Sequence, residues 1–137
     1  MDYRAHITRE GTHWLASFPD CPGCQTFGNS RTELLEMAAD ALSGWLEAHL
    51  VDGETPPPPK AKTGARICVT LNVAVAIQIR WMREELGLTQ TQLAQRLGVS
   101  QQAIAKLERS GGNPSIETLQ RLAKALGRQV NVTFEAA

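Results

Sequence analysis

The feature that most constrains this fold is a series of helix boundaries between residues 72 and 128. Four segments there repeat apolar residues at helical spacing: residues 73–87, 90–97, 101–110 and 116–127. Stop and capping signals separate them, at Gly87, Thr89 with Gln92, Gly98, Ser100 and Ser115. A short helix, a three-residue glycine-containing turn and a second helix form a helix-turn-helix. The sequence therefore predicts an all-helical domain over residues 72–137.

The two short helices of this motif must cross closely. We expect five side chains to be buried between them and to fix their angle: Ala94, Leu97, Val99, Ile104 and Leu107. The small side chain of Ala94 is important, because helices that cross closely leave little room at the contact.

The N-terminal half shows strand patterns and one helix pattern. Four segments have strand character: residues 3–10, 13–18, 25–28 and 65–71. A capping box at Ser30 and Glu33 starts an amphipathic helix over residues 31–50. The chain is thus predicted to be α+β, with a small antiparallel sheet and one covering helix in residues 1–71, followed by the helix-turn-helix domain.

A proline-rich segment separates the two halves. Residues 55–64 include four consecutive prolines, which favour an extended backbone, and their Gly, Thr and Lys neighbours build no core. Residues 1–71 carry six Lys and Arg against nine Asp and Glu, a net charge of −3. Residues 72–137 carry eight against five, a net charge of +3. We expect two modules with different partners, and residues 1–71 to fold and act alone.

A Cys-Pro-Gly-Cys sequence at residues 21–24 suggests either a redox dithiol or half of a zinc site. A redox pair needs a helix N-terminus beside the first thiol, but the next helix starts at Ser30. A zinc site needs a second pair of ligands, and the remaining candidates stand singly, at Cys68, His6, His13 and His49. The favoured interpretation is a tight Pro-Gly turn with two incidental side chains.

Composition also limits the setting of the protein. Three cysteines, an odd number, argue against a disulfide framework. The sequence has no apolar run long enough to span a bilayer, and its first ten residues lack a signal-peptide pattern. We expect a cytoplasmic protein, associated with the nucleoid when bound to DNA, with no membrane partner, metal or cofactor.

Two stretches resemble known families. Residues 88–127, "LTQTQLAQRLGVSQQAIAKLERSGGNPSIETLQRLAKALG", resemble the Xre or phage-repressor helix-turn-helix family. Residues 3–46 resemble the HicB antitoxin domain, whose pattern runs from a strand pair through F-P-D-x-P-G-C-x-T-x-G to a helix containing E-L-L-E-x-A. Within that pattern only Pro22, Gly23 and Cys24 of the Cys-x-x-Cys stretch are motif positions, so the spacing to Cys21 is interpreted as accidental.

The resemblance implies an antitoxin of a type II toxin–antitoxin system. HicB-type antitoxins bind a small RNA-cleaving HicA toxin and repress their own operon, and their domain is a partial ribonuclease-H-like fold. An enzyme of that fold would need converging carboxylates, whereas Asp2, Glu10 and Asp20 lie near strand ends or turns, so we expect no catalysis. Two alternatives stay open: a stand-alone transcriptional regulator with an N-terminal ligand-sensing domain, and a redox-responsive repressor that uses Cys21 and Cys24.

Acidic residues gather on the helix of the N-terminal half. Residues 32–54 contain six carboxylates and no Lys or Arg. A toxin that binds RNA must expose positive charge, so an acidic surface would attract it. Candidate toxin contacts are Glu33, Glu36, Asp40 and Glu47, with an ordinary solvated helix face as the alternative.

The DNA-binding candidates follow from the second helix of the motif, whose N-terminal side chains reach base edges in the major groove. Gln101 is the first candidate for an adenine contact, because its amide matches adenine N6 and N7, and Gln102 lies beside it. Lys106, one turn further, suits a guanine or a phosphate. Phosphate contacts are expected from Gln90, which matches the family's phosphate-binding position, Ser100 and Asn113. Exposed glutamines without a special role are the alternative.

The last residues predict assembly. Val130, Val132 and Phe134 alternate with polar residues, which predicts a strand over residues 129–135 that needs a pairing partner. It either returns to the N-terminal sheet or pairs with the same strand of a second copy. We expect the second, a homodimer with higher oligomers possible through the N-terminal domains. Its two reading helices would lie about 34 Å apart on an inverted-repeat operator.

Overall fold

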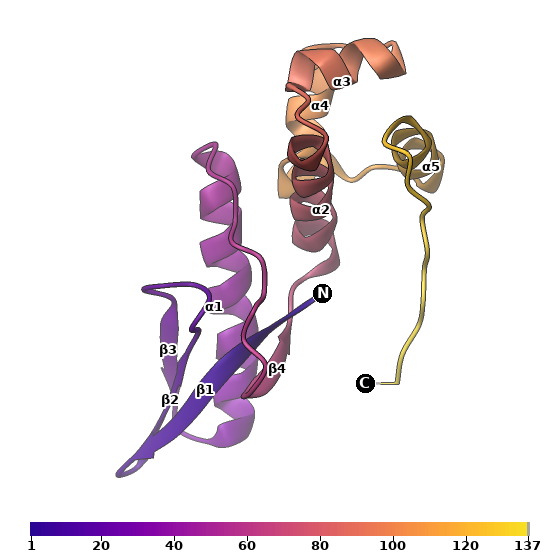
Figure 1. The fold of residues 1–137 in the computed structure, drawn as a ribbon. Helices are drawn as coiled ribbons and strands as arrows, with labels where there is room; N and C mark the ends of the chain where they lie inside the picture. Colours follow the sequence, from indigo (N-terminus) through magenta and orange to yellow (C-terminus); the bar gives the residue numbers. More distant parts are fainter. Residues whose placement is uncertain (137) are drawn as a thin grey trace.

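The computed structural model describes residues 1–136 and shows a small sheet with one covering helix, followed by a helical domain (Figure 1). The antiparallel sheet has the strand order β3-β2-β1-β4, formed by β1 (Asp2–Glu10), β2 (His13–Ser17), β3 (Gln25–Gly28) and β4 (Ala65–Cys68). The helices are α1 (Arg31–Val51), α2 (Leu71–Glu85), α3 (Gln90–Leu97), α4 (Gln101–Leu107), the short 3-10 helix η1 (Ser110–Gly112) and α5 (Ile116–Ala125). The predicted α+β class is confirmed.

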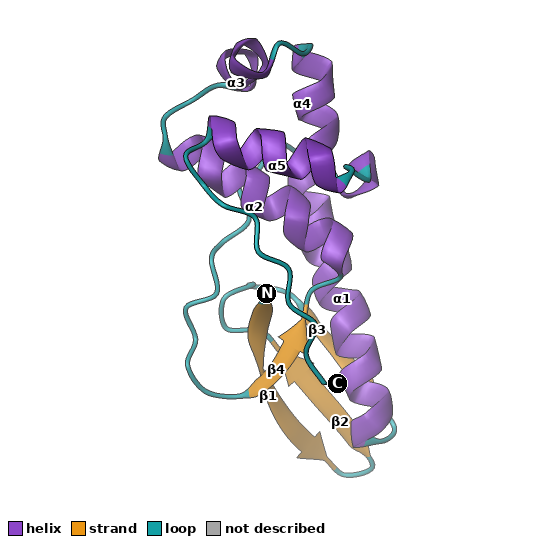
Figure 2. Ribbon diagram, turned by 90° about the vertical axis from the view of Figure 1, so that its right-hand side faces the viewer, coloured by secondary structure: helices purple, strands orange, loops and turns teal. Residues whose placement is uncertain are grey.

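Strand alternation decides which face of the sheet is buried. Helix α1 covers one face of the sheet (Figure 2). Tyr3, Ala5 and Ala16 are buried on that face, whereas His6 and Thr8, which alternate with the inward positions of β1, are exposed. The turn between β1 and β2 pairs Glu10 with His13, as expected for a hairpin. One face of this sheet is therefore core and the other is open.

Helix α1 begins at the predicted cap. The Ser30 hydroxyl accepts a hydrogen bond from the Glu33 backbone N–H at 3.1 Å. Its buried face packs on the sheet through Leu34, Ala38, Leu42, Leu46 and Leu50. The amphipathic pattern thus places α1 as a lid over the sheet.

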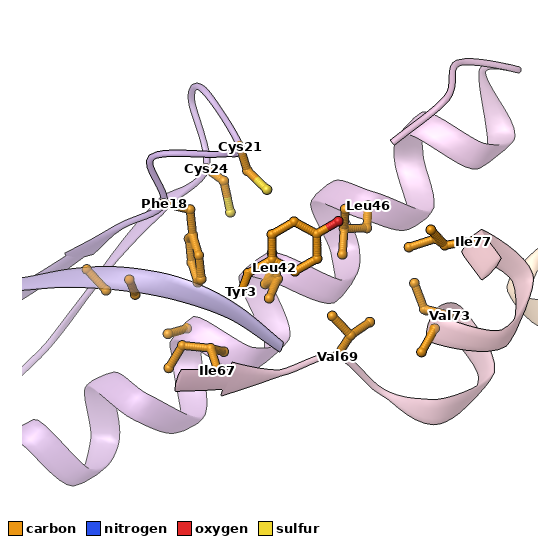
Figure 3. Close-up of a cluster of buried hydrophobic side chains, with 14 of the residues drawn as sticks. Tyr3, Phe18, Cys21, Cys24, Leu42, Leu46, Ile67, Val69, Val73 and Ile77 are labelled. Carbon is orange, nitrogen blue, oxygen red and sulfur yellow. The ribbon is translucent and has the colours of Figure 1, made fainter. Parts of the chain in front are cut away.

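Helix α2 contributes to two cores. Val73, Ala74, Ala76 and Ile77 pack with the sheet and α1, and Figure 3 shows Val73 and Ile77 beside Leu46 and Val69. Ile79, two residues further along the same helix, belongs to the core of the helix-turn-helix domain. A division between residues 71 and 72 would remove α2 from the first core. Contrary to expectation, residues 1–71 do not contain the whole core of the N-terminal half.

The proline-rich segment is a bound strap rather than a free break. It runs from the end of α1 back along that helix to β4 (Figure 1). Prolines have no backbone N–H, so this segment cannot form a regular backbone hydrogen-bond ladder, and side chains from other elements bind its carbonyl groups. Tyr3 Oη donates to Pro57 O at 2.5 Å and Trp81 Nε1 donates to Pro56 O at 2.9 Å. Asp20 Oδ2 accepts the N–H groups of Lys60 and Ala61, each at 2.9 Å. The expected extended backbone is present, but it is fixed by Tyr3 and Asp20 of the N-terminal half and by Trp81 of α2.

The predicted strand over residues 129–135 is not formed in the single chain. Residues 128–136 leave α5 and descend to the level of the sheet without joining it (Figures 1 and 2). The side chains of Val132 and Phe134 are 65% and 95% exposed, whereas Val130 is half-buried. A strand requires a hydrogen-bonded neighbour, and within residues 1–136 no segment offers one to this tail.

Candidate nucleic-acid interface

Local capping shapes the helix-turn-helix. Thr89 Oγ1 accepts from the Gln92 N–H at 3.1 Å while Gln92 Oε1 accepts from the Thr89 N–H at 2.9 Å, which completes the predicted capping box of α3. Gly98 ends α3 with a φ of 68°, in the left-handed region that glycine tolerates without strain. Ser100 then caps α4 by accepting the Ala103 N–H at 3.2 Å. These caps and the glycine define where α3 ends and α4 begins, and so fix the turn between the two helices.

The core under the two helices largely matches its prediction. Ala94 and Ile104 are buried with Leu93 and Leu122, and Leu97 and Leu107 are half-buried. The prediction for Val99 is wrong, because its side chain is 38% exposed. Val99 instead lines an open hollow of about 320 Å³ between α4 and α5.

A buried ion pair, missed at the sequence level, fixes α4 to α2. Arg83 donates from Nε to Glu108 Oε2 at 2.7 Å and from Nη2 to Oε1 at 2.8 Å. Its Nη1 donates to the Leu88 carbonyl at 2.7 Å, just before α3. Arg83 is 8% and Glu108 2% exposed, and the hydrogen bond to Glu108 raises the pKa of Arg83. The signal in the sequence was the position of Glu108, four residues after buried Ile104 on the same helical face.

The predicted reading residues gather at the exposed start of α4. Gln101 Nε2 donates to Gln90 Oε1 at 2.6 Å, which joins residues eleven apart in the chain. This bond fixes the plane of the Gln101 side-chain amide and leaves its carbonyl oxygen free to accept a hydrogen bond. Gln102 is exposed beside it. The Ser100 hydroxyl is already occupied as the α4 cap. Four of the six candidates thus lie at one end of the motif: Gln90, Ser100, Gln101 and Gln102.

The remaining candidates lie along the hollow between α4 and α5. Lys106 and Asn113 both line it, and Asn113 adopts a left-handed φ of 40°. Arg121 of α5 also lines this hollow and donates from Nη2 to the Leu97 carbonyl at 3.0 Å. The sequence reasoning did not single out Arg121, although its place on the exposed side of an amphipathic helix was a usable signal. Two cationic side chains, Lys106 and Arg121, therefore line the hollow beside α4.

The four acidic candidates on α1 do not form one free surface. Glu33 accepts a hydrogen bond from the backbone N–H of Asn29 at 3.2 Å. Glu47 accepts one from the Ser110 hydroxyl of η1, so it connects the two halves of the chain. Glu36 and Asp40 are exposed along the outer side of α1. Of the predicted acidic surface, Glu36 and Asp40 remain as exposed carboxylates.

The two cysteines of the Cys-x-x-Cys stretch are core residues. Cys21 is fully buried, and both sulfurs lie near Phe18 and Tyr3 (Figure 3). Burial raises the pKa of Cys21 to about 12 and that of Cys24 to about 11. A redox dithiol needs a lowered thiol pKa, so this environment argues against the redox-responsive alternative. Cys21 is also not incidental, because it fills the core.

No helix within residues 1–136 combines the length and apolar character needed to cross a membrane.

Two carboxylates considered for catalysis have structural partners. Asp2 pairs with Arg66 at 2.5 Å, and Asp20 holds the strap. The Cys68 thiol donates to the other oxygen of Asp2 at 3.0 Å, and these bonds lower the pKa of the Asp2 carboxyl.

Comparisons with known proteins match both halves. The profile of the family described as the HicB-like antitoxin of bacterial toxin-antitoxin systems matches residues 3–82, and a helix-turn-helix profile matches residues 79–132. Antitoxin HicB 1 of Photorhabdus laumondii is 34% identical over 122 residues, covering 89% of this chain and 79% of that protein. Antitoxin HicB of Escherichia coli K12 is 29% identical over 123 residues, covering 88% and 89%. The immunity repressor protein of Bacillus phage phi105 is 42% identical over 59 residues, 43% of this chain and 41% of its own length.

Proposed function

The chain belongs to the HicB-like antitoxin family, and we propose that it neutralises a HicA-type mRNA-cleaving toxin and represses its own operon. The observation that carries this proposal is the continuity of the two modules. The two family matches overlap at residues 79–82, inside α2, which packs in both cores. A chain built this way would keep toxin binding and DNA binding in one folded unit.

For DNA binding, we propose that α4 enters the major groove and Gln101 reads an adenine. The hydrogen bond that Gln101 Nε2 donates to Gln90 fixes the Gln101 amide before DNA binds, so little side-chain freedom is lost on binding. Gln102 is a second base contact. Ser100, Lys106 and Asn113, with Gln90, are proposed phosphate contacts that set the register of α4.

For toxin binding, we propose that the acidic N-terminal half attracts a basic partner. Residues 1–71 carry a net charge of −3, and Glu36 and Asp40 are exposed on α1. Glu33 and Glu47 are weaker contacts, since both already accept hydrogen bonds within the chain. Complementary charge would accelerate the encounter of the two proteins more than it would tighten the complex.

For assembly, we propose that residues 129–135 pair with the same residues of a second copy through Val130, Val132 and Phe134. The exposure of Val132 and Phe134 in the single chain supports this proposal, because pairing would bury their apolar side chains and satisfy the backbone hydrogen-bonding groups of the segment. Deletion of residues 129–137 should leave toxin binding intact and weaken operator binding. Unchanged mass by light scattering together with unchanged operator affinity would contradict the interface.

The proposed function is tested by expressing the reading frame next to this gene, alone and together with the chain. We expect arrested growth with the neighbour alone, rescue by the chain, and binding of the purified chain to an inverted repeat upstream of the operon. Operator binding without any rescue would favour the alternative of a stand-alone transcriptional regulator with a ligand-sensing N-terminal domain.

A further inference from the structure

A groove in the N-terminal half lies outside the surfaces described so far. The loop after β2, the last turns of α1 and the strap enclose about 640 Å³. Pro19 and Pro22 form one wall, and Pro57 and Pro58 form the other. Proline rings keep their shape when a ligand binds, and the strap is fixed by its bonds to Tyr3 and Asp20. The groove is therefore preformed.

Its inner surface is aromatic. The rings of Trp45 and His49, one turn apart on α1, have centroids 3.9 Å apart and planes inclined by 31°. His49 Nδ1 donates to the Trp45 carbonyl at 3.0 Å, which fixes the imidazole over the indole. The indole is half-buried and lines the groove. An aromatic surface of this kind attracts a cation.

Two carboxylates stand at the same groove. Gly53, with a φ of 76°, lets the chain reverse after α1, so that the Glu54 N–H bonds the His49 carbonyl at 2.9 Å. This reversal brings Glu54 Oε2 to 3.4 Å from His49 Nε2, with the Glu54 side chain 63% exposed. Asp20 holds the strap through Oδ2, and within residues 1–136 no donor bonds its Oδ1. Among the described residues that line the groove, Lys60 is the one lysine, and no arginine lines it.

We propose that this groove receives a cationic side chain, arginine above all, from the toxin partner; this inference rests on the proposed function. A guanidinium is planar, so it can stack on the Trp45–His49 pair while its N–H groups bond Glu54 and the free oxygen of Asp20. The proline walls fit the apolar stem of the same side chain. The groove would then be the specific anchor, and the general acidity of this half would steer the partner toward it.

The groove is separate from the outer acidic side of α1. At 100° per residue, Glu36 and Asp40 lie roughly 140–180° around the helix from Trp45. Glu36 is therefore a matched control for Glu54: both are exposed glutamates of the same half, and only Glu54 lines the groove.

The first test is an NMR titration of the full-length chain with N-acetylarginine amide. We expect saturable shifts of the Trp45 indole N–H, with no change at Trp14 on the sheet. The neutral isostere N-acetylcitrulline amide should bind about three- to fivefold more weakly, and Glu54→Gln should cause a loss of similar size. Equal shifts with both compounds, an unchanged response in Glu54→Gln, or no saturable shift would overturn the proposal.

The second test uses the toxin encoded beside this gene. Glu54→Arg should weaken the complex by at least about tenfold, Glu36→Arg should change it by less than about threefold, and operator binding should be unaffected by both. Equal effects of the two variants, or a larger effect of Glu36→Arg, would contradict the groove as anchor. If the native chain neutralises no toxin although the arginine titration succeeds, the proposed function fails and the groove remains a site for a cationic side chain.

Discussion

The helical half and the sheet half of this chain are stabilised over different distances along the sequence. In the helical half, the caps at Thr89, Ser100 and Ser115 each join residues three positions apart. In the sheet half, the strap is held by bonds between residues 54 and 40 positions apart, Tyr3 with Pro57 and Asp20 with Lys60. Local bonds form a helix as soon as the chain turns, whereas the strap depends on an assembled sheet. Substitutions and truncations should therefore destabilise the two halves in different ways.

The largest effect is expected from cutting the chain at the two possible boundaries. Residues 1–71 lose Val73, Ala74, Ala76 and Ile77, and burial of the two larger side chains alone is worth about 3–6 kcal/mol. We expect residues 1–71 to be unfolded or molten and residues 1–85 to fold, by circular dichroism and dispersed NMR spectra. A cooperative unfolding transition for residues 1–71 would show that the sheet half is independent of α2.

The next effect concerns a buried long-range contact of the helical half, the ion pair of Arg83 with Glu108. Glu108→Ala leaves Arg83 charged and buried without its partner, which should lower the free energy of unfolding by about 3–5 kcal/mol. The exposed Glu117→Ala is the control and should change it by less than about 0.5 kcal/mol. Urea unfolding measures both. A loss below 1 kcal/mol for Glu108→Ala would mean that local caps suffice to hold this half.

A third effect should appear in alkaline solution and only in the sheet half. The pKa of Cys21 is raised to about 12 and that of Cys24 to about 11 in the folded chain, above the ordinary value near 9. The unfolded chain therefore loses these protons first, so stability is complete below pH 9 and falls toward pH 11, by up to about 1.4 kcal/mol per pH unit for each thiol. Cys21→Ala should flatten this slope. An unchanged slope in that variant would assign the alkaline loss to other groups.

The smallest effect concerns a single bond of the strap. Tyr3→Phe removes the donor to the Pro57 carbonyl while keeping the buried ring, and should cost about 1 kcal/mol. Hydrogen exchange at Lys60 and Ala61 should report a looser strap, while exchange in α4 stays the same. Faster exchange in α4 to the same extent would indicate that the two halves unfold as one unit.

The same contrast explains what the sequence predicted. The helices of the motif, the α1 cap and the hairpin were all correct, because each depends on residues close together in the chain. The strap was interpreted as a break because proline composition shows an extended backbone but not what binds it. Cys21 was interpreted as incidental because its burial depends on packing with Tyr3 and Phe18 in the folded chain, which the spacing of the two cysteines does not show.

The candidate site shows the same limit. The position of the candidate reading residues followed from the motif. The bond between Gln90 and Gln101 and the pair of Arg83 with Glu108 join separate helices. Spacing within one helix indicates that Glu108 faces the core, but it does not identify its partner. The strand over residues 129–135 is not formed for a further reason: alternation of apolar and polar residues indicates strand character, but a strand also needs a hydrogen-bonded neighbour, and the single chain offers none within residues 1–136.

The central claim, that one chain carries two separable binding functions, is tested most directly by Gln101→Ala measured in both assays. Specific operator binding should fall by about 1–3 kcal/mol, with relaxed preference at one base pair, because the variant lacks the amide that we propose reads adenine. Binding to random DNA and rescue of growth from the toxin should be unchanged, since Gln101 lies in the helix-turn-helix and is exposed away from the first core. Equal losses on operator and random DNA, or loss of rescue, would contradict the account.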